Sequence, residues 1–309
     1  MNAHRRLVVI LGPTASGKSA LAIALAERLD GEVLACDSTQ VYRHFDIGTG
    51  KVPLADRRGI SHHLIDLVEP DEVFTAGDYR RRATDILEAI CARRKLPILT
   101  AGTGLYLRAL LEGLADAPGR SDELRERLRE RSVRHGPEHL HRILKRLDRE
   151  SASRIAAADT QKLIRAIEIR VLSGEPASAL HQRGREGLEG YRVIKIGLMP
   201  ARAALYERIE RRVISMLGFG WLTEVKGLIN KGIAPSVKPF DFLGYSQLRD
   251  VLGDEMKLDE AVKQIQQATR QYAKRQLTWF RKEADVHWIE GFGDDLRVVE
   301  DALRRVAEG

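Results

Sequence analysis

Cysteine is scarce in this chain of 309 residues, which holds only two, Cys36 and Cys91. They lie far apart, and the sequence has no Cys-x-x-Cys pair and no cysteine–histidine spacing of the kind that binds zinc. A zinc site is therefore not expected. Because Cys36 falls in an apolar run typical of a buried strand, a reducing cytoplasmic compartment is the simplest interpretation.

Long hydrophobic runs are also absent. The opening stretch MNAHRRLVVIL has five consecutive apolar residues before Gly12, too few for a signal peptide or a membrane span. No internal repeat and no low-complexity segment occurs, and a net charge of +7 is mild for a nucleic-acid binder. We expect a cytoplasmic protein with no membrane partner, in which the distribution of charge matters more than its sum.

A glycine-rich loop follows the first apolar run. The segment LVVILGPTASGKSALAIALAERL, residues 7–29, matches G-x-x-x-x-G-K-[ST] in full, with a strand pattern before it and a helix pattern after it. We expect the amides of residues 14–18 to point inward, Lys18 to supply a charge and the Ser19 hydroxyl to suit Mg²⁺. The predicted phosphate-binding residues are Gly12, Thr14, Ala15, Ser16, Gly17, Lys18 and Ser19. The motif does not name the reaction.

Four further apolar runs are separated by helical patterns. This alternation predicts an α/β fold, a phosphate-loop core with a parallel sheet flanked by helices, and a hydrophobic content of 43% is enough for a packed core. The third run ends in the turn AGTG, which puts Thr103 near the carboxyl ends of the strands, where open α/β sheets bind ligands. The predicted strands are Leu7–Leu11, Val33–Cys36, Leu96–Thr100, Val193–Leu198 and Val286–Ile289.

The middle of the chain breaks this alternation and shows no convincing strand pattern. One helical pattern begins at a Ser121 cap, a second has an apolar face at i, i+3, i+4 and i+7, and a third ends near Gly174. The apolar face consists of Leu140, Ile143, Leu144 and Leu147. We expect a small all-helical module, residues 119–190, inserted into a core made of residues 1–118 and 191–309.

Basic residues concentrate in KQIQQATRQYAKRQLTWFRK, residues 263–282, which contains no acid. Because a solvated helix face usually mixes both signs, this segment favours binding to a phosphate backbone, through residues such as Arg270 and Lys274. An ordinary soluble surface is the alternative. Trp279 and Phe280 are expected in the core rather than stacked on bases.

The acid that commonly anchors nucleotide-bound Mg²⁺ at the end of a second strand is missing, since LPILT leads to AGTG. The strand VLAC leads instead to DSTQVYR, which places Asp37 at the edge of the sheet. Asp37 suits a magnesium ligand, a helix cap or a general base. His62 and His63 are adjacent and point apart, so they make a poor metal pair and are expected to be structural.

Seven short segments together resemble the tRNA dimethylallyltransferase family, also called the tRNA isopentenyltransferases. They occur in the family's order and span nearly the whole chain. They are GPTASGKS (12–19), DSTQVYR (37–43), HHLID (62–66), AGTGLY (101–106), TQKLIRAIE (160–168), GY (244–245) and TRQYAKRQLTWFR (269–281). Each except the phosphate loop is weak alone, but the set is highly specific.

The resemblance implies a reaction. Members of the family move a dimethylallyl group from dimethylallyl diphosphate to N6 of adenosine 37 in the anticodon loop of tRNA, and pyrophosphate leaves. Mg²⁺ near Ser19 is the implied cofactor. The diphosphate would bind the phosphate loop, with Arg212 as a further contact. Asp37 would be the base that removes a proton from the attacking amine, and Thr103 would lie by the reacting centre.

The resemblance also implies contacts with tRNA. The implied contacts are Asp37, Ser38, Thr39, Gln40, Thr103, Arg125, Gln161, Lys162, Leu163, Ile164, Arg165, Gly244 and Tyr245. The chain departs from the family in two places. It has AGTG where the family often has GGTG, and it has Asp241 and Ser246 beside the GY pair, where the family often has basic residues.

Two other functions remain open from the residues alone. A small-molecule kinase explains the phosphate loop and the fold class but not the basic segment near the C-terminus. An RNA-binding NTPase explains the charge, but nothing marks a base-specific nucleotide pocket or a residue that positions water. We expect the protein to be a monomer.

Overall fold

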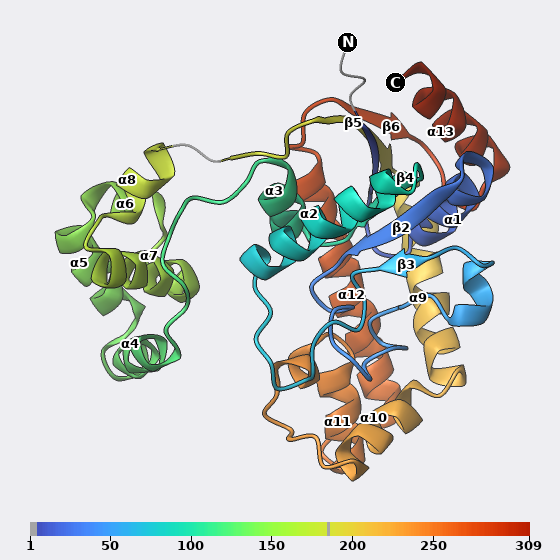
Figure 1. Cartoon of the computed structure of the whole chain (residues 1–309). Coiled ribbons are helices and arrows are strands. Elements are labelled where there is room, and N and C mark those ends of the chain that lie inside the picture. The colour runs from blue at the N-terminus through green and yellow to red at the C-terminus, as the bar shows by residue number, and fades with distance from the viewer. Residues whose placement is uncertain (1–4, 184–185) are drawn as a thin grey trace. The chain divides into compact units, whose positions relative to one another are not determined.

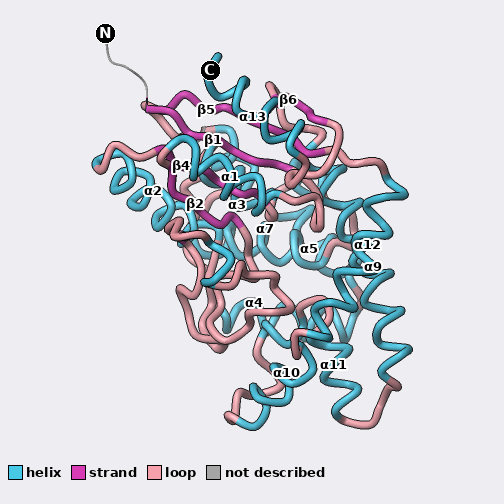
Figure 2. Tube along the Cα trace, turned by 90° about the vertical axis from the view of Figure 1, so that its right-hand side faces the viewer, coloured by secondary structure: helices cyan, strands magenta, loops and turns pink. Residues whose placement is uncertain are grey.

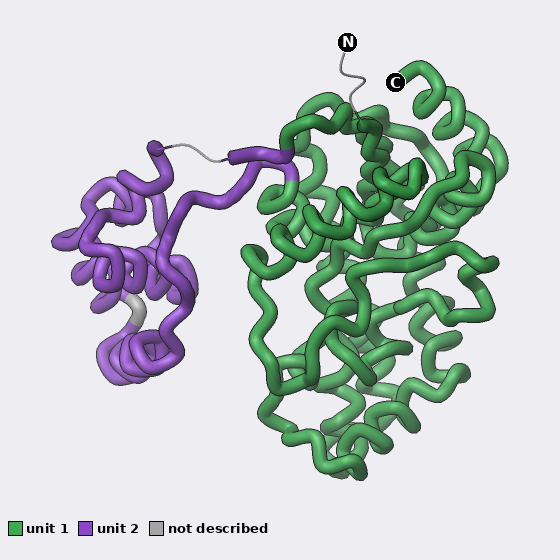
Figure 3. Tube along the Cα trace, viewed as in Figure 1, with its two compact units in different colours: residues 1–110, 189–309 green, residues 111–188 purple. Residues whose placement is uncertain are grey.

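The structure is a computed structural model of the chain, and it describes residues 5–183 and 186–309 (Figure 1). It divides into two compact units (Figure 3): unit 1 comprises Met1–Leu110 and Glu189–Gly309, and unit 2 comprises Leu111–Leu188. Unit 2 begins before the expected boundary at residue 119 and ends before residue 190. The two segments that bound it pair with each other, because Leu188 N–H donates to Leu111 O at 3.0 Å.

Unit 1 is built on a six-stranded sheet in the order β3-β2-β4-β1-β5-β6, and every neighbouring pair is parallel. The predicted α/β fold is confirmed, and all five predicted strands are present. β3 is additional, and two residues are too few to leave a periodic pattern in the sequence. The strands are β1 (Arg5–Leu11), β2 (Gly31–Cys36), β3 (His62–His63), β4 (Leu96–Ala101), β5 (Tyr191–Leu198) and β6 (Val286–Ile289).

Helices cover the sheet and hide its apolar side chains from water, as a parallel sheet requires. α1 (Lys18–Leu29) and α13 (Leu296–Glu308) share one apolar cluster with side chains of β1, β2, β4 and β5. α2 (Ala76–Ala92) and α3 (Gly104–Leu111) are joined by stacking of Tyr79 on Tyr106, with ring centroids 4.5 Å apart. The short helix η1 (Leu54–Arg57) precedes β3.

Four helices of unit 1 gather away from the strands (Figure 2). They are α9 (Arg202–Gly218), α10 (Trp221–Asn230), α11 (Tyr245–Leu252) and α12 (Leu258–Phe280). With the short helix η2 (Lys238–Asp241) and the loop after β2, they bury Phe45, Trp221, Phe240 and Tyr245 in a second core. The basic segment lies in α12, which has 23 residues. None of the helices in the described residues is long and apolar enough to cross a lipid bilayer.

Unit 2 consists of five helices in its described residues: α4 (Asp122–His135), α5 (Pro137–Leu147), α6 (Arg149–Arg154), α7 (Thr160–Ser173) and α8 (Ala177–Gln182). Ser121 caps α4 by accepting the Leu124 N–H at 3.3 Å, and Gly174 ends α7 in the left-handed conformation. α6 and α8 have six residues each, too few for a recognisable period. The apolar sides of the helices form one core.

Candidate active site

The phosphate loop joins β1 to α1. Gly17 caps α1 with a φ of 89°, a backbone conformation that any residue with a Cβ atom adopts at a cost. Within the described chain the amides of Ala15, Gly17 and Lys18 donate no hydrogen bond. The buried hydroxyl of Ser16 also has no partner there. Unsatisfied donors at the start of a helix are what an anion requires, so these residues fit a phosphate group.

Two amides of the loop are already used, so the expectation that all amides from residue 14 to residue 18 face the phosphate is wrong. Thr14 N–H donates to Oε1 of Gln276 at 2.7 Å, and Ser16 N–H donates to Pro13 O at 3.2 Å. The first bond comes from α12, far away in sequence. The second closes a turn within the loop itself.

Two cations accompany the loop. Lys18 Nζ donates to the carbonyl oxygens of Gly12 and Pro13, each at 2.9 Å. Burial lowers the pKa of Lys18 to about 8, although the Asp37 carboxylate opposes this shift. Burial also lowers the pKa of Arg212, which projects from α9. Two desolvated positive charges near one carboxylate favour the binding of an anion.

Asp37 directly follows β2, and Thr103 lies two residues after the end of β4. Asp37 Oδ1 accepts the Thr39 N–H at 2.9 Å and the Thr39 hydroxyl at 2.7 Å. No helix begins there, so the helix-cap interpretation of Asp37 is wrong, and the carboxylate stabilises a turn instead. Thr103 Oγ1 accepts the Ser38 N–H at 2.9 Å and bonds to the Ser38 hydroxyl at 3.2 Å. These contacts hold the two predicted catalytic residues on adjoining turns.

The second carboxylate oxygen of Asp37 lies against Gly102. A Cβ atom on Gly102 would lie 2.4 Å from Oδ2 of Asp37, so a larger residue there would displace this carboxylate oxygen. Within the described chain Oδ2 accepts no hydrogen bond, whereas Oδ1 accepts two. One oxygen therefore fixes the carboxylate and the other is available to accept a proton.

Gln276 of α12 also reaches this turn. Its Nε2 donates to Gly102 O at 2.8 Å, and the Tyr272 hydroxyl lies 3.4 Å from the same oxygen. Burial raises the pKa of Tyr272, and the nearby Asp37 carboxylate raises it further. Gln276 had no signal in the sequence, because its partners lie more than a hundred residues away and glutamine is not a typical core residue.

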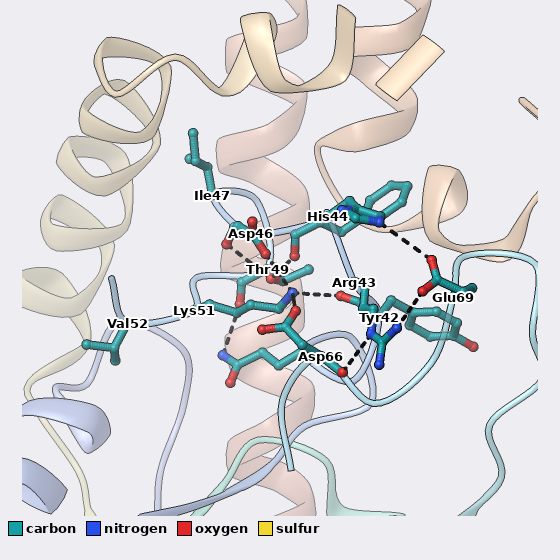
Figure 4. Close-up of polar contacts among 12 residues, drawn as sticks. Tyr42, Arg43, His44, Asp46, Ile47, Thr49, Lys51, Val52, Asp66 and Glu69 are labelled. Carbon is teal, nitrogen blue, oxygen red and sulfur yellow. Dashed lines mark hydrogen bonds and ion pairs between the residues drawn. The ribbon is translucent and has the colours of Figure 1, made fainter. Parts of the chain in front are cut away.

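A buried lysine organises the loop that follows Asp37 (Figure 4). Lys51 Nζ donates to Tyr42 O at 2.6 Å, to Asp46 Oδ1 at 2.7 Å and to Asp66 Oδ1 at 2.5 Å. All three ammonium protons are therefore used, as a buried lysine requires.

The same loop carries Gln40 and Gly50 to the cations. Gln40 Nε2 donates to Thr49 O at 3.1 Å and to Gly50 O at 3.3 Å. A Cβ atom on Gly50, whose φ is 68°, would collide with Nη2 of Arg212. Gln40, expected to contact tRNA, therefore has its amide nitrogen engaged in shaping the turn beside Arg212.

Known proteins with similar sequences decide the family. A family profile described as IPP transferase matches residues 40–283. The chain is 49% identical over 302 residues to the tRNA dimethylallyltransferase of Solibacter usitatus, with 98% of each chain covered. The chain belongs to the tRNA dimethylallyltransferase family.

Solved structures of the family have the same fold. The full-length tRNA isopentenylpyrophosphate transferase from Bacillus halodurans is 36% identical, with a TM-score of 0.72 over 98% of this chain and 96% of that one. A eukaryotic dimethylallyltransferase acting on tRNA is 26% identical, with a TM-score of 0.83 over 98% of this chain and 77% of that one.

The residues of α7 that are expected to contact tRNA differ in their exposure to solvent. Gln161 and Lys162 are exposed, whereas Leu163 and Ile164 are buried in the core of unit 2. The side chains of Leu163 and Ile164 are therefore occupied by the core of unit 2, and the contact of these two positions with tRNA stays a prediction. Their physical role is to pack α7 against its neighbours.

Arg125 and Arg165 face inward to a shared acid. Both oxygens of Glu168 accept from Arg125 at 2.7 Å, and Arg165 adds a third bond at 2.6 Å. Burial raises the pKa of Glu168, but hydrogen bonds from Arg125, the Ser121 N–H and Arg165 outweigh it and lower the value to about 2. The two arginines are thus partly neutralised within unit 2.

The GY pair is internal. Gly244 has a φ of 91°, and a Cβ atom there would collide with the Trp221 ring. The buried Tyr245 hydroxyl donates to Glu224 Oε1 at 2.6 Å and accepts the Gly48 N–H at 3.1 Å. Both residues support the second core and the loop after β2, and their expected contact with tRNA stays a prediction.

The basic face of α12 is less uniform than its sequence predicts. Arg270 pairs with Glu210 of α9 at 2.8 Å, while Lys274 is exposed. Lys274 borders a cavity of about 280 Å³, together with Arg202 and Arg281. A segment without acids can still be neutralised by a neighbouring helix, which the sequence pattern does not reveal.

The two aromatic residues that end α12 differ in burial. Phe280 is fully buried, as expected, but Trp279 is 37% exposed, so its placement in the core is wrong. The Arg108 guanidinium lies 4.8 Å from the centre of the Trp279 ring. This cation–π contact stabilises an aromatic side chain that remains partly open to solvent.

The two adjacent histidines have different partners. His63 Nε2 pairs with Glu32 Oε2 at 2.6 Å, and His62 Nδ1 bonds Ile60 O at 2.9 Å. Within residues 5–183 and 186–309 no group of three acids, histidines or cysteines could hold a metal ion by itself. A magnesium ion beside Ser19 would therefore need oxygen ligands from a bound phosphate, as is usual for this ion.

Proposed function

We propose that the protein transfers a dimethylallyl group from dimethylallyl diphosphate to N6 of adenosine 37 in the anticodon loop of tRNA and releases pyrophosphate. One observation carries the proposal: the phosphate loop and the half-buried cations Lys18 and Arg212 form a site for an anion beside the Asp37 carboxylate, which keeps one oxygen available. An electrophile with a diphosphate leaving group fits the anion site. A nucleophile with a removable proton fits the Asp37 carboxylate.

The diphosphate half supplies charge stabilisation. As the C1–O bond breaks, its electron pair moves onto the diphosphate, and negative charge grows there. Lys18, Arg212 and the unsatisfied loop amides interact more strongly with the diphosphate as it gains charge in the transition state than they do with the intact donor. They therefore lower the barrier. A bound Mg²⁺ would neutralise further charge, held by the Ser19 hydroxyl and by diphosphate oxygens.

The acceptor half removes a proton. The N6 amine of adenosine is a weak nucleophile because its lone pair is delocalised into the ring. As the N6–C1 bond forms, Oδ2 of Asp37 accepts the N6 proton, so charge does not build up on nitrogen. Thr103 and Ser38 hold the neighbouring turn, and Oδ1 is fixed by Thr39.

The acceptor must leave the stack of the anticodon loop before N6 can reach C1, because a stacked base hides this atom. Exposed lysines on α12 and the exposed Gln161 and Lys162 of unit 2 are the surfaces that we assign to the tRNA backbone. We expect the reaction to occur in the cytoplasm, where tRNA is, and the monomeric state stays a prediction.

Incubation with radiolabelled dimethylallyl diphosphate and bulk tRNA tests the function. Label should enter tRNA, and digestion to nucleosides should recover it on adenosine. A kinase would instead consume ATP without label transfer or dependence on tRNA. An RNA-dependent NTPase would hydrolyse ATP or GTP when tRNA is added, and would leave the prenyl donor intact.

A further inference from the structure

Gln276 is a buried amide that joins two loops of unit 1. Its Oε1 accepts the Thr14 N–H at 2.7 Å, and its Nε2 donates to Gly102 O at 2.8 Å. Thr14 belongs to the phosphate loop after β1, and Gly102 belongs to the turn after β4. A single side chain from α12 therefore fixes the separation of two turns that follow neighbouring strands.

The Gln276 amide satisfies both partners, because its oxygen accepts a hydrogen bond and its nitrogen donates one. A backbone N–H needs an acceptor and a backbone carbonyl needs a donor, so the orientation of the Gln276 amide is set by its neighbours. An ionised carboxylate of the same shape would keep the first bond but face the Gly102 carbonyl with a second acceptor. An aliphatic side chain would leave both buried backbone groups unpaired.

Each bridged turn carries one half of the reaction. The phosphate loop holds Lys18, and Gln276 engages the Thr14 N–H, whereas the amides of Ala15, Gly17 and Lys18 remain unsatisfied within the described chain. Gly102 touches Oδ2 of Asp37, the oxygen available for the proton. Gln276 therefore connects the loop that fits a phosphate group to the turn beside the Asp37 carboxylate.

We infer that Gln276 is a positioning residue for prenyl transfer, a role that rests on the proposed function. It acts through the two backbone groups and holds the donor in line with the acceptor amine. A displacement of about 1 Å at a reacting centre costs about 10²-fold in rate, even when both substrates still bind. The role therefore belongs to the chemical step rather than to affinity.

The test compares Gln276→Glu and Gln276→Ala with Gln271→Glu, which adds the same charge at an exposed position of α12. Single-turnover transfer is measured with both substrates saturating, and equilibrium binding of pyrophosphate and tRNA is measured separately. We expect both Gln276 variants to lose about 10²-fold in single-turnover rate, with binding constants within about threefold of wild type. The Gln271 variant should keep its single-turnover rate.

The pH dependence of the Gln276→Glu transfer rate distinguishes a positioning role from a loss of folded protein. A protonated carboxyl group accepts one hydrogen bond and donates another, so it restores both contacts of the amide. The rate of Gln276→Glu relative to wild type should therefore rise about tenfold or more as the pH falls and the introduced carboxyl becomes protonated. Gln276→Ala should show no such recovery, and thermal unfolding at each pH reports the folded fraction.

Two results would overturn this role: single-turnover rates within threefold of wild type for both Gln276 variants, or losses that follow weakened binding or a lower folded fraction. Wild-type enzyme without label transfer to tRNA would instead reject the proposed function. The two failures are therefore distinguishable in one series of measurements.

Discussion

At the scale of single residues, the Asp37 carboxylate has two unequal oxygens. One accepts two hydrogen bonds from Thr39, and the other lies against the bare backbone of Gly102. Asp37→Asn preserves the shape but cannot take a proton, so kcat should fall about 10²-fold or more while tRNA affinity changes little. Steady-state kinetics with an independent tRNA-binding measurement checks this. Wild-type turnover in the variant would remove Asp37 from the mechanism.

The lowered pKa of Lys18 makes the affinity of the free enzyme for pyrophosphate depend on pH. Its pKa is lowered to about 8, so it is charged below that pH and increasingly neutral above it. Pyrophosphate favours the charged form, so its affinity should fall as the pH rises through 8, and binding should take up a proton in that window. Calorimetry in buffers of different ionisation enthalpy measures the uptake. Lys18→Ala is the control, since only the titration of pyrophosphate itself should remain.

Some residues of the site could be placed from the sequence, and others could not. Asp37 and Thr103 lie just after strand patterns, and the carboxyl ends of parallel strands share one edge of a sheet. Gln276 bonds a residue 262 positions away, and no local pattern encodes such a contact. The apolar helical spacing of Leu163 and Ile164 agrees with their burial, whereas the tRNA contact that the resemblance implies for them stays a prediction.

At the scale of elements, the loop after β2 depends on Lys51. Its side chain is 4% exposed, whereas those of Asp46 and Asp66 are 58% and 43% exposed. Lys51→Met should therefore lower the free energy of unfolding by only about 1–2 kcal/mol, because water can solvate the two acids left behind. The more exposed pair of Lys95 and Asp30 provides the control. Lys95→Met should lower the free energy of unfolding clearly less than Lys51→Met in the same denaturant titration.

α12 combines a structural face with a charged one. Lys274 is exposed and has no acid partner among the described residues, whereas Arg270 pairs with Glu210. If α12 contacts phosphates, Lys274→Ala should reduce the slope of log affinity for tRNA against log salt by about 1. Arg270→Ala should reduce it less, because its charge is already offset. An unchanged slope for Lys274→Ala would mean that Lys274 does not contact tRNA phosphates and that its charge serves only solubility.

The elements themselves were largely predictable, because strands and amphipathic helices leave periodic patterns of apolar residues. Short elements such as β3, α6 and α8 were not, since they span less than two full periods. Burial of Gly244 and Tyr245 was missed for another reason. Their partners Trp221 and Glu224 come from α10, and contact between α10 and α11 is a tertiary property.

At the scale of the whole molecule, the central claim is that the phosphate loop holds the diphosphate of a prenyl donor rather than ATP. The β4 turn has no acid to hold nucleotide-bound Mg²⁺, and the Asp37 carboxylate beside that turn has the position that we propose for a base. A phosphate loop recognises phosphates alone, so the group beyond them decides its ligand.

Competition at the loop tests this claim most directly. Dimethylallyl diphosphate and pyrophosphate should displace one another from the enzyme, and Lys18→Ala should weaken both by about 1.5–3 kcal/mol, the loss of a charge-assisted contact. ATP should not be turned over in the same assay. Steady ATP hydrolysis that Lys18→Ala abolishes and that the prenyl donor does not affect would contradict the account and favour a kinase.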